Sequence, residues 1–143
     1  LAENGGAIYN EWANIFLILN STFSENEAES GGAIYNRGLM SGLESYINII
    51  DFSTFYQNQA NEGESIYNEG LFSFINSISN SILQGDSVQI EGNTTNVTST
   101  GNNIFWPIAG ITLDLSDTEV DPMLDPNLAL NDSLTVTPTH ALL

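Results

Sequence analysis

The feature that most constrains the fold of this chain is an internal repeat of short, β-rich segments that Asn and Gly separate. One motif occurs three times, as AENGGAIYN, AESGGAIYN and ANEGESIYN, at residues 2–10, 28–36 and 60–68. A second motif lies between the copies of the first, as STFSEN at 21–26, STFYQN at 53–58 and a weaker NSILQG at 80–85. The segments are too short for a βαβ unit and show no helical periodicity. The repeat therefore predicts an all-β solenoid in which each repeat forms one rung.

Stacked rungs place equivalent residues directly above one another, about 4.8 Å apart. We expect two inward apolar ladders, an amide ladder at each of two corners and an outward aromatic ladder. The apolar ladders are Ile8, Ile34 and Ile66, and Phe23 and Phe55 with Ile82. The amide ladders are Asn10, Asn36 and Asn68, and Asn26 and Asn58, and the aromatic ladder is Tyr9, Tyr35 and Tyr67. Asn amides can hydrogen-bond along such a stack. Gly5, Gly31 and Gly63 are expected at a bend between strands.

The predicted fold is a right-handed, single-stranded parallel β-helix of about five rungs, which occupy residues 1–105. The second rung carries an insertion around Met40–Tyr46, and the repeat becomes irregular after Gly85. Residues 106–143 are rich in acidic residues and contain all four prolines of the chain. We expect them to form an irregular cap or linking segment of the same domain, because an open rung is prone to aggregate.

The charge of the chain is strongly one-sided. The chain has eighteen acidic residues and a single base, Arg37, which gives a net charge of −17. A basic patch for nucleic acid is therefore excluded, and anionic membrane surfaces are disfavoured. No run approaches the roughly 20 apolar residues that a membrane span requires.

Few residues are suited to catalysis. His140 is the single histidine and cysteine is absent, so a His/Cys zinc site cannot form within the chain. No G-x-S-x-G sequence is present to supply a serine nucleophile. We therefore expect a protein that is not an enzyme and that needs no cofactor, with calcium as the one candidate ion.

Calcium takes oxygen ligands, and the densest group of carboxylates is Asp114, Asp117, Glu119 and Asp121. The alternative interpretation of this group is a solvated acidic face. Four N-x-S/T sequons are candidate glycosylation sites, at Asn20, Asn93, Asn96 and Asn131. Asn93 and Asn96 fall in the irregular region, whereas Asn20 precedes a predicted strand.

The GGAIYN segments followed by NSTFSEN resemble bacterial surface and secreted β-helix repeat proteins. The pairing of GGAI with FxxN is similar to the polymorphic outer-membrane proteins of chlamydiae, and GNNIF with the closing LTVTPTHALL resembles the choice-of-anchor Q domain family. The resemblance implies an extracellular or cell-surface protein with a structural or adhesive role. It also implies an alternative, a carbohydrate-binding or carbohydrate-cleaving parallel β-helix. Polysaccharide lyases with this fold commonly use an Arg or Lys base, for which Arg37 is the sole candidate here.

The first GGAIYN strand lies at residues 2–10, with no distinct cap ahead of it. An uncovered rung exposes unpaired backbone groups and apolar core. We therefore expect either end-to-end self-association into a filament or a larger parent protein that supplies further rungs. Glycans are a further candidate partner, because Trp12 and the tyrosine ladder could stack on sugars.

Overall fold

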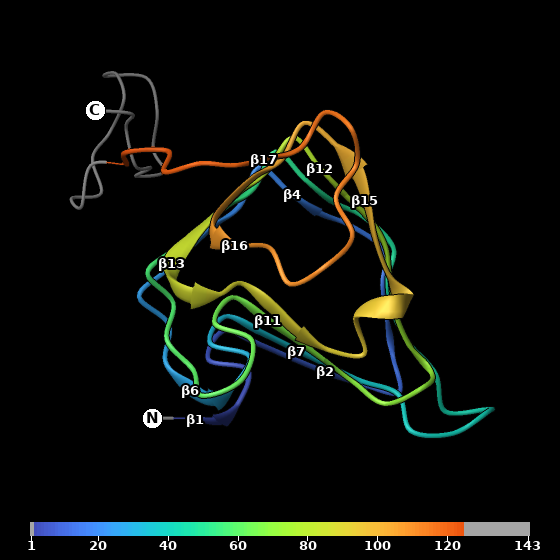
Figure 1. Cartoon of the computed structure of the whole chain (residues 1–143). Helices are drawn as coiled ribbons and strands as arrows, with labels where there is room; N and C mark the ends of the chain where they lie inside the picture. The colour runs from blue at the N-terminus through green and yellow to red at the C-terminus, as the bar shows by residue number, and fades with distance from the viewer. Residues whose placement is uncertain (1, 125–143) are drawn as a thin grey trace.

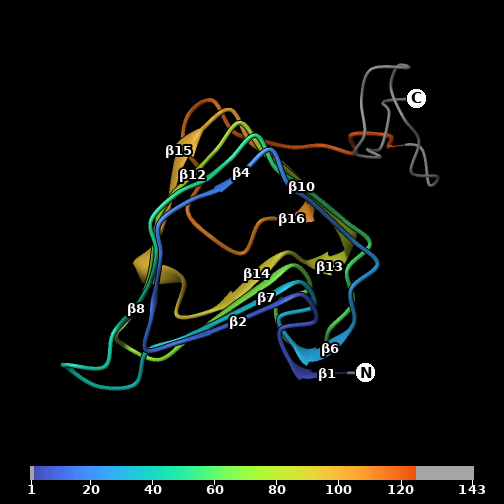
Figure 2. The same ribbon diagram turned by 180° about the vertical axis from the view of Figure 1, so that it is seen from behind.

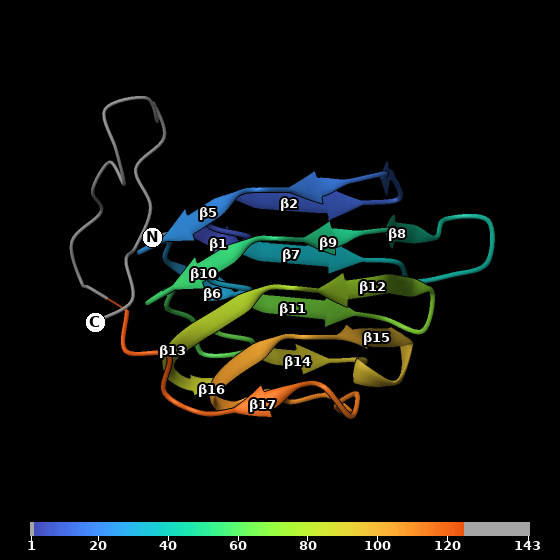
Figure 3. The ribbon, with the colours of Figure 1, turned by 90° about the horizontal axis from the view of Figure 1, so that it is seen from above.

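The computed structural model describes residues 2–124, which wind into a right-handed β-solenoid of triangular cross-section (Figure 1). The chain runs counter-clockwise in Figure 1 as it advances toward the viewer, and Figure 2 shows the same winding from behind. The turns stack in parallel (Figure 3), as expected. The described residues contain no α-helix, only a 3-10 turn at Thr94–Asn96. None of them forms a helix that is long and apolar enough to cross a membrane.

The GGAIYN motifs form the first side of the triangle. Its strands are β2 (Ile8–Glu11), β7 (Ile34–Arg37), β11 (Ile66–Glu69) and β14 (Ile90–Gly92). Ile8, Ile34 and Ile66 are in register, which confirms the aliphatic ladder. Ile90 adds a fourth, fully buried member.

The STF motifs form the second side of the triangle. Its strands are β5 (Thr22–Ser24), β10 (Thr54–Tyr56), β13 (Ile82–Val88), β16 (Ile104–Ile108) and β17 (Thr118–Glu119). The rings of Phe23 and Phe55 stack with centroids 4.7 Å apart. The assignment of Ile82 to this ladder is wrong, since Phe55 pairs with Leu83. A shift of one residue moves a side chain to the opposite face of a strand, so Leu83 is buried instead.

The third side is broken by a bend in its first two turns. Its strands are β3 (Asn14–Ile15), β4 (Ile18–Leu19), β8 (Ser45–Ile47), β9 (Ile50–Asp51), β12 (Ser73–Ser79) and β15 (Val97–Gly101). Strand β12 runs through the bend and pairs with both β8 and β9. Isoleucines fill the interior of this side, where Ile47, Ile50, Ile75 and Ile78 are fully buried.

Strands β1 (Ala2–Asn4) and β6 (Ala28–Ser30) form a small sheet that precedes β2 and β7. The chain then bends at Gly5, Gly31 and Gly63, whose φ angles lie between +60° and +63°. A Cβ atom at Gly31 would collide with the carbonyl oxygen of Ile34. These positions therefore require glycine, as the repeat predicted.

The last described turn is less regular than those before it. Strand β16 runs through residue 106, where the irregular segment was expected to begin, and β17 pairs with it in parallel. Beyond β17 the structure describes the chain as far as Leu124. Asn131, His140 and the remainder of the expected C-terminal segment lie outside the described residues.

Candidate functional site

The buried corner of the solenoid is built from amides. Asn10 Nδ2 donates to Asn36 Oδ1 over 2.7 Å, and Asn36 Nδ2 donates to Asn68 Oδ1 over 2.8 Å. Asn26 Nδ2 donates to Asn58 Oδ1 over 2.8 Å at a second corner. Since buried amides need partners, these side chains hold the turns in register.

A further polar column went unnoticed in the sequence, at the serine that opens each STF motif. The backbone N–H of Ser21 donates to Ser53 Oγ, and that of Ser53 donates to Ser81 Oγ. The column continues as the N–H of Ser81 donates to Asn103 Oδ1 and that of Asn103 to Asp117 Oδ1, each over 2.9 Å. The repeated serine in STF was the available signal, and its role is to satisfy the backbone of the neighbouring turn.

The tyrosine ladder stacks as expected but leaves little ring face free. The centroids of Tyr9 and Tyr35 are 5.3 Å apart, and those of Tyr35 and Tyr67 are 5.7 Å apart. Tyr35 is only 5% exposed, because its neighbours cover both faces of its ring. Burial, followed by the charge of Glu62, raises the pKa of Tyr67. Sugar binding through stacking requires a free ring face, which within this ladder only Tyr9 offers.

Arg37 lies between two acidic residues on neighbouring turns. Its Nη1 is 3.1 Å from Glu11 Oε1, and its Nε is 3.3 Å from Glu69 Oε2. The Nε contact does not have hydrogen-bond geometry. Burial, followed by the charge of Glu11, raises the pKa of Glu69. This arrangement occupies the guanidinium with structural ion pairs and gives it no geometry of a catalytic base.

A buried carboxylate that the sequence did not single out lies where the second glycine of GGAIYN is replaced. Glu64 is 5% exposed and accepts hydrogen bonds from the backbone N–H groups of Asp86 and Ser87 and from Gln89 Nε2, at 2.8 Å each. A Cβ atom at Gly85 would collide with Glu64 Oε2. The glycine lost at position 64 is therefore matched by a glycine in the next turn, which makes room for the carboxylate.

The four carboxylates considered for calcium serve the last turn separately. Their oxygens accept hydrogen bonds from neighbouring groups: Asp114 from Ser116, Asp117 from Asn103 and Ser99, Glu119 from the N–H of Ala109, and Asp121 from the N–H of Met123. The hydrogen bond from Ser116 lowers the pKa of Asp114. Within residues 2–124, no three acidic or histidine side chains gather closely enough to hold a metal ion.

Two of the three sequons in the described part of the chain take part in the fold through their asparagine amides. Asn93 Nδ2 donates to the carbonyl of Gly70 over 2.8 Å, and Asn96 Nδ2 donates to that of Leu71 over 3.0 Å. Asn20 is exposed at a corner with φ of +48°. Of the three, Asn20 could carry a glycan with the least change to the fold.

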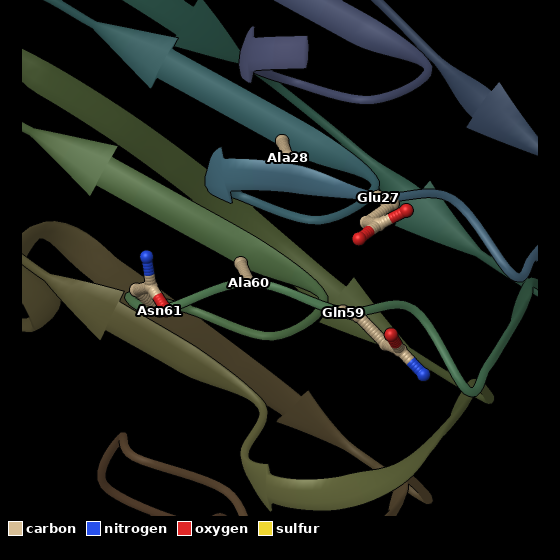
Figure 4. A pocket seen from close by; sticks show the side chains of 5 residues that line it. All are labelled: Glu27, Ala28, Gln59, Ala60 and Asn61. Atoms are coloured by element: carbon tan, nitrogen blue, oxygen red, sulfur yellow. The ribbon is translucent and has the colours of Figure 1, made fainter. Parts of the chain in front are cut away.

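Two pockets of the described surface lie between turns. One has a volume of 270 Å³ and is lined by the β6 segment and the next turn (Figure 4), at Glu27, Ala28, Gln59, Ala60 and Asn61. Another, of 320 Å³, lies beside β15 and the loop before Asp114, and threonines dominate its lining. Neither pocket brings together two carboxylates, so neither has the paired acids that glycoside hydrolysis requires.

In two neighbouring turns, the loop that connects the first side to the third side projects from the stack. The strand register widens from an offset of 26 residues at Glu11↔Arg37 to 32 at Asn14↔Tyr46, so the expected insertion lies between Arg37 and Tyr46. The resulting β7–β8 loop projects from the solenoid beside the shorter β11–β12 loop (Figures 1 and 3). A backbone hydrogen bond from Leu43 N to Met40 O closes the tip of the longer loop.

The segment from β5 through β7 contains one STF motif and the GGAIYN motif that follows it. Residues 20–37 match the Chlamydia polymorphic membrane protein repeat. This match supports the chlamydial part of the resemblance but not the likeness to choice-of-anchor Q domains. No curated protein and no solved structure matches the chain.

The matched repeat places its motif residues in structural positions. Phe23 packs against the core, Asn26 bonds to the next turn, and Ile34 is fully buried. Gly31 takes the left-handed conformation at the bend. The matched residues thus build the solenoid, which is compatible with a repeat protein of a cell surface.

Proposed function

We propose that this chain is an adhesive module of a surface-displayed β-solenoid, in which the stacked turns form a rod that carries binding loops on its side. The observation that supports this most is that the repeated motifs and the projecting loop have different structural roles. The repeated motif residues are used in ladders between turns, whereas the chain departs from the repeat at the projecting β7–β8 loop.

The rod is proposed to extend at its β2 edge. Among the described residues, no strand pairs with the outer edges of β2, β3, β4 and β5. Ile8 and Phe23 are only partly buried there, whereas their counterparts Ile34 and Phe55 are fully buried. A further turn with the same motif, from a second copy or a longer parent chain, would complete the ladders.

Adhesion is tested by coating fluorescent beads with the folded chain and counting the beads that attach to cultured epithelial cells. Beads that carry the urea-unfolded chain are the control, because they have the same composition and charge. Folded chain should give clearly more attached beads. Equal attachment by both kinds of bead would overturn the adhesive role.

Extension of the rod is tested by sedimentation velocity and negative-stain microscopy over a range of concentrations, with and without calcium. Oligomers that lengthen with concentration would support stacking of copies. A monomer under every condition would overturn self-assembly and favour a longer parent chain.

A further inference from the structure

The projecting corner carries a cluster of exposed aliphatic side chains. Leu39, Met40 and Leu43 of the β7–β8 loop are 38%, 54% and 36% exposed, and Leu71 of the β11–β12 loop is 76% exposed. Leu39 lies directly beside Gly70 of the neighbouring turn. We call these four residues the loop patch.

The exposure of the loop patch is not caused by an open end of the stack. Phe16 and Leu17 are also exposed, but they lie in the first described turn, which has no turn on its outer side. The loop patch belongs to the second and third turns, which have neighbours on both sides (Figure 3). Its side chains are exposed because the chain leaves the stack at this corner.

Several polar backbone groups of the two loops already have partners within the solenoid. Gly42 N donates to Glu44 Oε1 over 3.0 Å, beside the Leu43–Met40 bond that closes the tip. In the shorter loop, the carbonyls of Gly70 and Leu71 accept from the amides of Asn93 and Asn96, and Ser73 Oγ also donates to Gly70. Backbone groups that already have partners lose less free energy when they leave water for a lipid interface.

The charged and aromatic residues around the loop patch indicate which kind of lipid headgroup it could contact. Glu11 and Glu69 lie at the base of the two loops, beside Arg37, whereas Glu44 directly follows the tip of the longer loop. The hydrogen bond from Gly42 lowers the pKa of Glu44, which favours its charged form. Trp12, half exposed, occupies the same corner one turn away, and its backbone N–H donates to the Arg37 carbonyl. Carboxylates repel anionic lipids, whereas carboxylates and an indole both attract the quaternary ammonium of choline.

We propose that the loop patch inserts into the surface of a phosphatidylcholine bilayer, with Trp12 and the neighbouring carboxylates at the level of the choline groups. Four aliphatic side chains on projecting loops can reach the acyl boundary while the charged faces of the rod stay in water. This inference rests on the proposed display of the chain at a surface, and it names the partner of the adhesive module as a zwitterionic membrane.

The first test is flotation of the folded chain with phosphatidylcholine vesicles. The double variant Leu39→Ser/Leu71→Ser should lower the partition coefficient about tenfold or more, because it removes two large apolar groups from the contact. The matched control is Phe16→Ser/Leu17→Ser, which removes as much exposed apolar surface elsewhere and should float like the unmodified chain. No flotation of the unmodified chain, or an equal loss in both variants, would overturn the proposal.

The second test follows Trp12 directly. In a Trp106→Phe background, the emission of Trp12 should shift to shorter wavelength with phosphatidylcholine vesicles. The shift should be smaller when roughly one third of the lipid is phosphatidylserine, since its charge repels the acidic chain. An unchanged emission with phosphatidylcholine would contradict the proposal. If coated beads attach to cells but the chain does not bind these vesicles, the membrane proposal is wrong. The adhesive function would then remain supported, with a protein receptor as the partner.

Discussion

The asparagine ladders on two sides of the solenoid differ in their access to water. Asn36 is fully buried, accepts from Asn10 and donates to Asn68. Asn48 occupies the middle of an outer ladder, where it donates to Asn14 over 2.6 Å and accepts from Asn76 over 2.8 Å. The hydrogen bonds are similar, but water can replace only those of the outer ladder.

We therefore predict that Asn36→Ala lowers the free energy of unfolding by about 1–3 kcal/mol, because it leaves a buried acceptor on Asn68 without its donor. Asn48→Ala should change it by no more than about 0.5 kcal/mol. Urea denaturation of the two variants measures both values. Similar losses in the two would show that water access does not decide the contribution of an amide ladder.

Glu69 provides a residue-level prediction about pH. Its pKa is raised in the folded state, first by burial and then by Glu11, so the folded chain binds this proton more tightly than the unfolded chain. Its ionisation therefore costs stability as pH rises through the unfolded and then the folded pKa. Glu69→Gln, which resembles the protonated form, should raise the urea midpoint slightly at pH 7, and the gain should vanish below the unfolded pKa. A lower midpoint at pH 7 would mean that the contact with Arg37 outweighs burial.

At the scale of elements, the length of a connecting loop can change without a change in the register of the strands that it connects. In the first turn, two residues, Trp12 and Ala13, connect β2 to β3, whereas the second turn uses a projecting loop at the same corner. The strands on both sides keep their register with the first turn. The long loop is thus an addition to the corner rather than a part of the core.

Deletion of residues 38–43 should accordingly leave a folded solenoid. It leaves Glu44 and Ser45 between Arg37 and Tyr46, which matches the two residues between their partners Glu11 and Asn14 in the first turn. Shortening a loop costs little chain entropy. Circular dichroism should remain β-type, and the free energy of unfolding should stay within about 1 kcal/mol. Loss of cooperative unfolding would show that the loop is needed for the fold. In the flotation assay, the same deletion should abolish binding to phosphatidylcholine.

At the scale of the whole molecule, charge opposes the stacking of turns. The chain carries a net charge of −17, and the parallel register places Glu3 opposite Glu29. The single base, Arg37, lies between Glu11 and Glu69 of the neighbouring turns. The amide, serine and apolar ladders must therefore hold the turns together against repulsion.

We predict that added salt stabilises the molecule. Raising the ionic strength from about 0.01 M to about 1 M shortens the screening length from roughly 30 Å to 3 Å, which weakens repulsion between turns. The urea midpoint should rise between these conditions, with sodium chloride as the salt. A lower midpoint at high salt would show that the three-residue ion-pair column contributes more than the general repulsion opposes.

The sequence by itself determined the solenoid, the aliphatic and aromatic ladders, both asparagine corners and the glycine bends. The neighbour of a repeated residue can be predicted from the sequence, because in-register stacking places the residue beside its counterpart in the next repeat. Contacts between residues of different types cannot be predicted in this way. The repeat could not distinguish Leu83 from Ile82, since NSILQG retains too little of the motif to fix a register to one residue.

Only the tertiary structure decided the contacts between unlike residues. The pairing of Glu64 with Gly85, and the bracing of the β11–β12 loop by Asn93 and Asn96, depend on how far each loop carries the chain before the next turn begins. The loop patch has the same origin, because Leu39 and Leu71 become neighbours in space only after two loops of different length leave the stack together. The sequence repeat determines which residues stack between turns. The lengths of the connecting loops determine which side chains project from the solenoid, and these lengths act only through the tertiary structure.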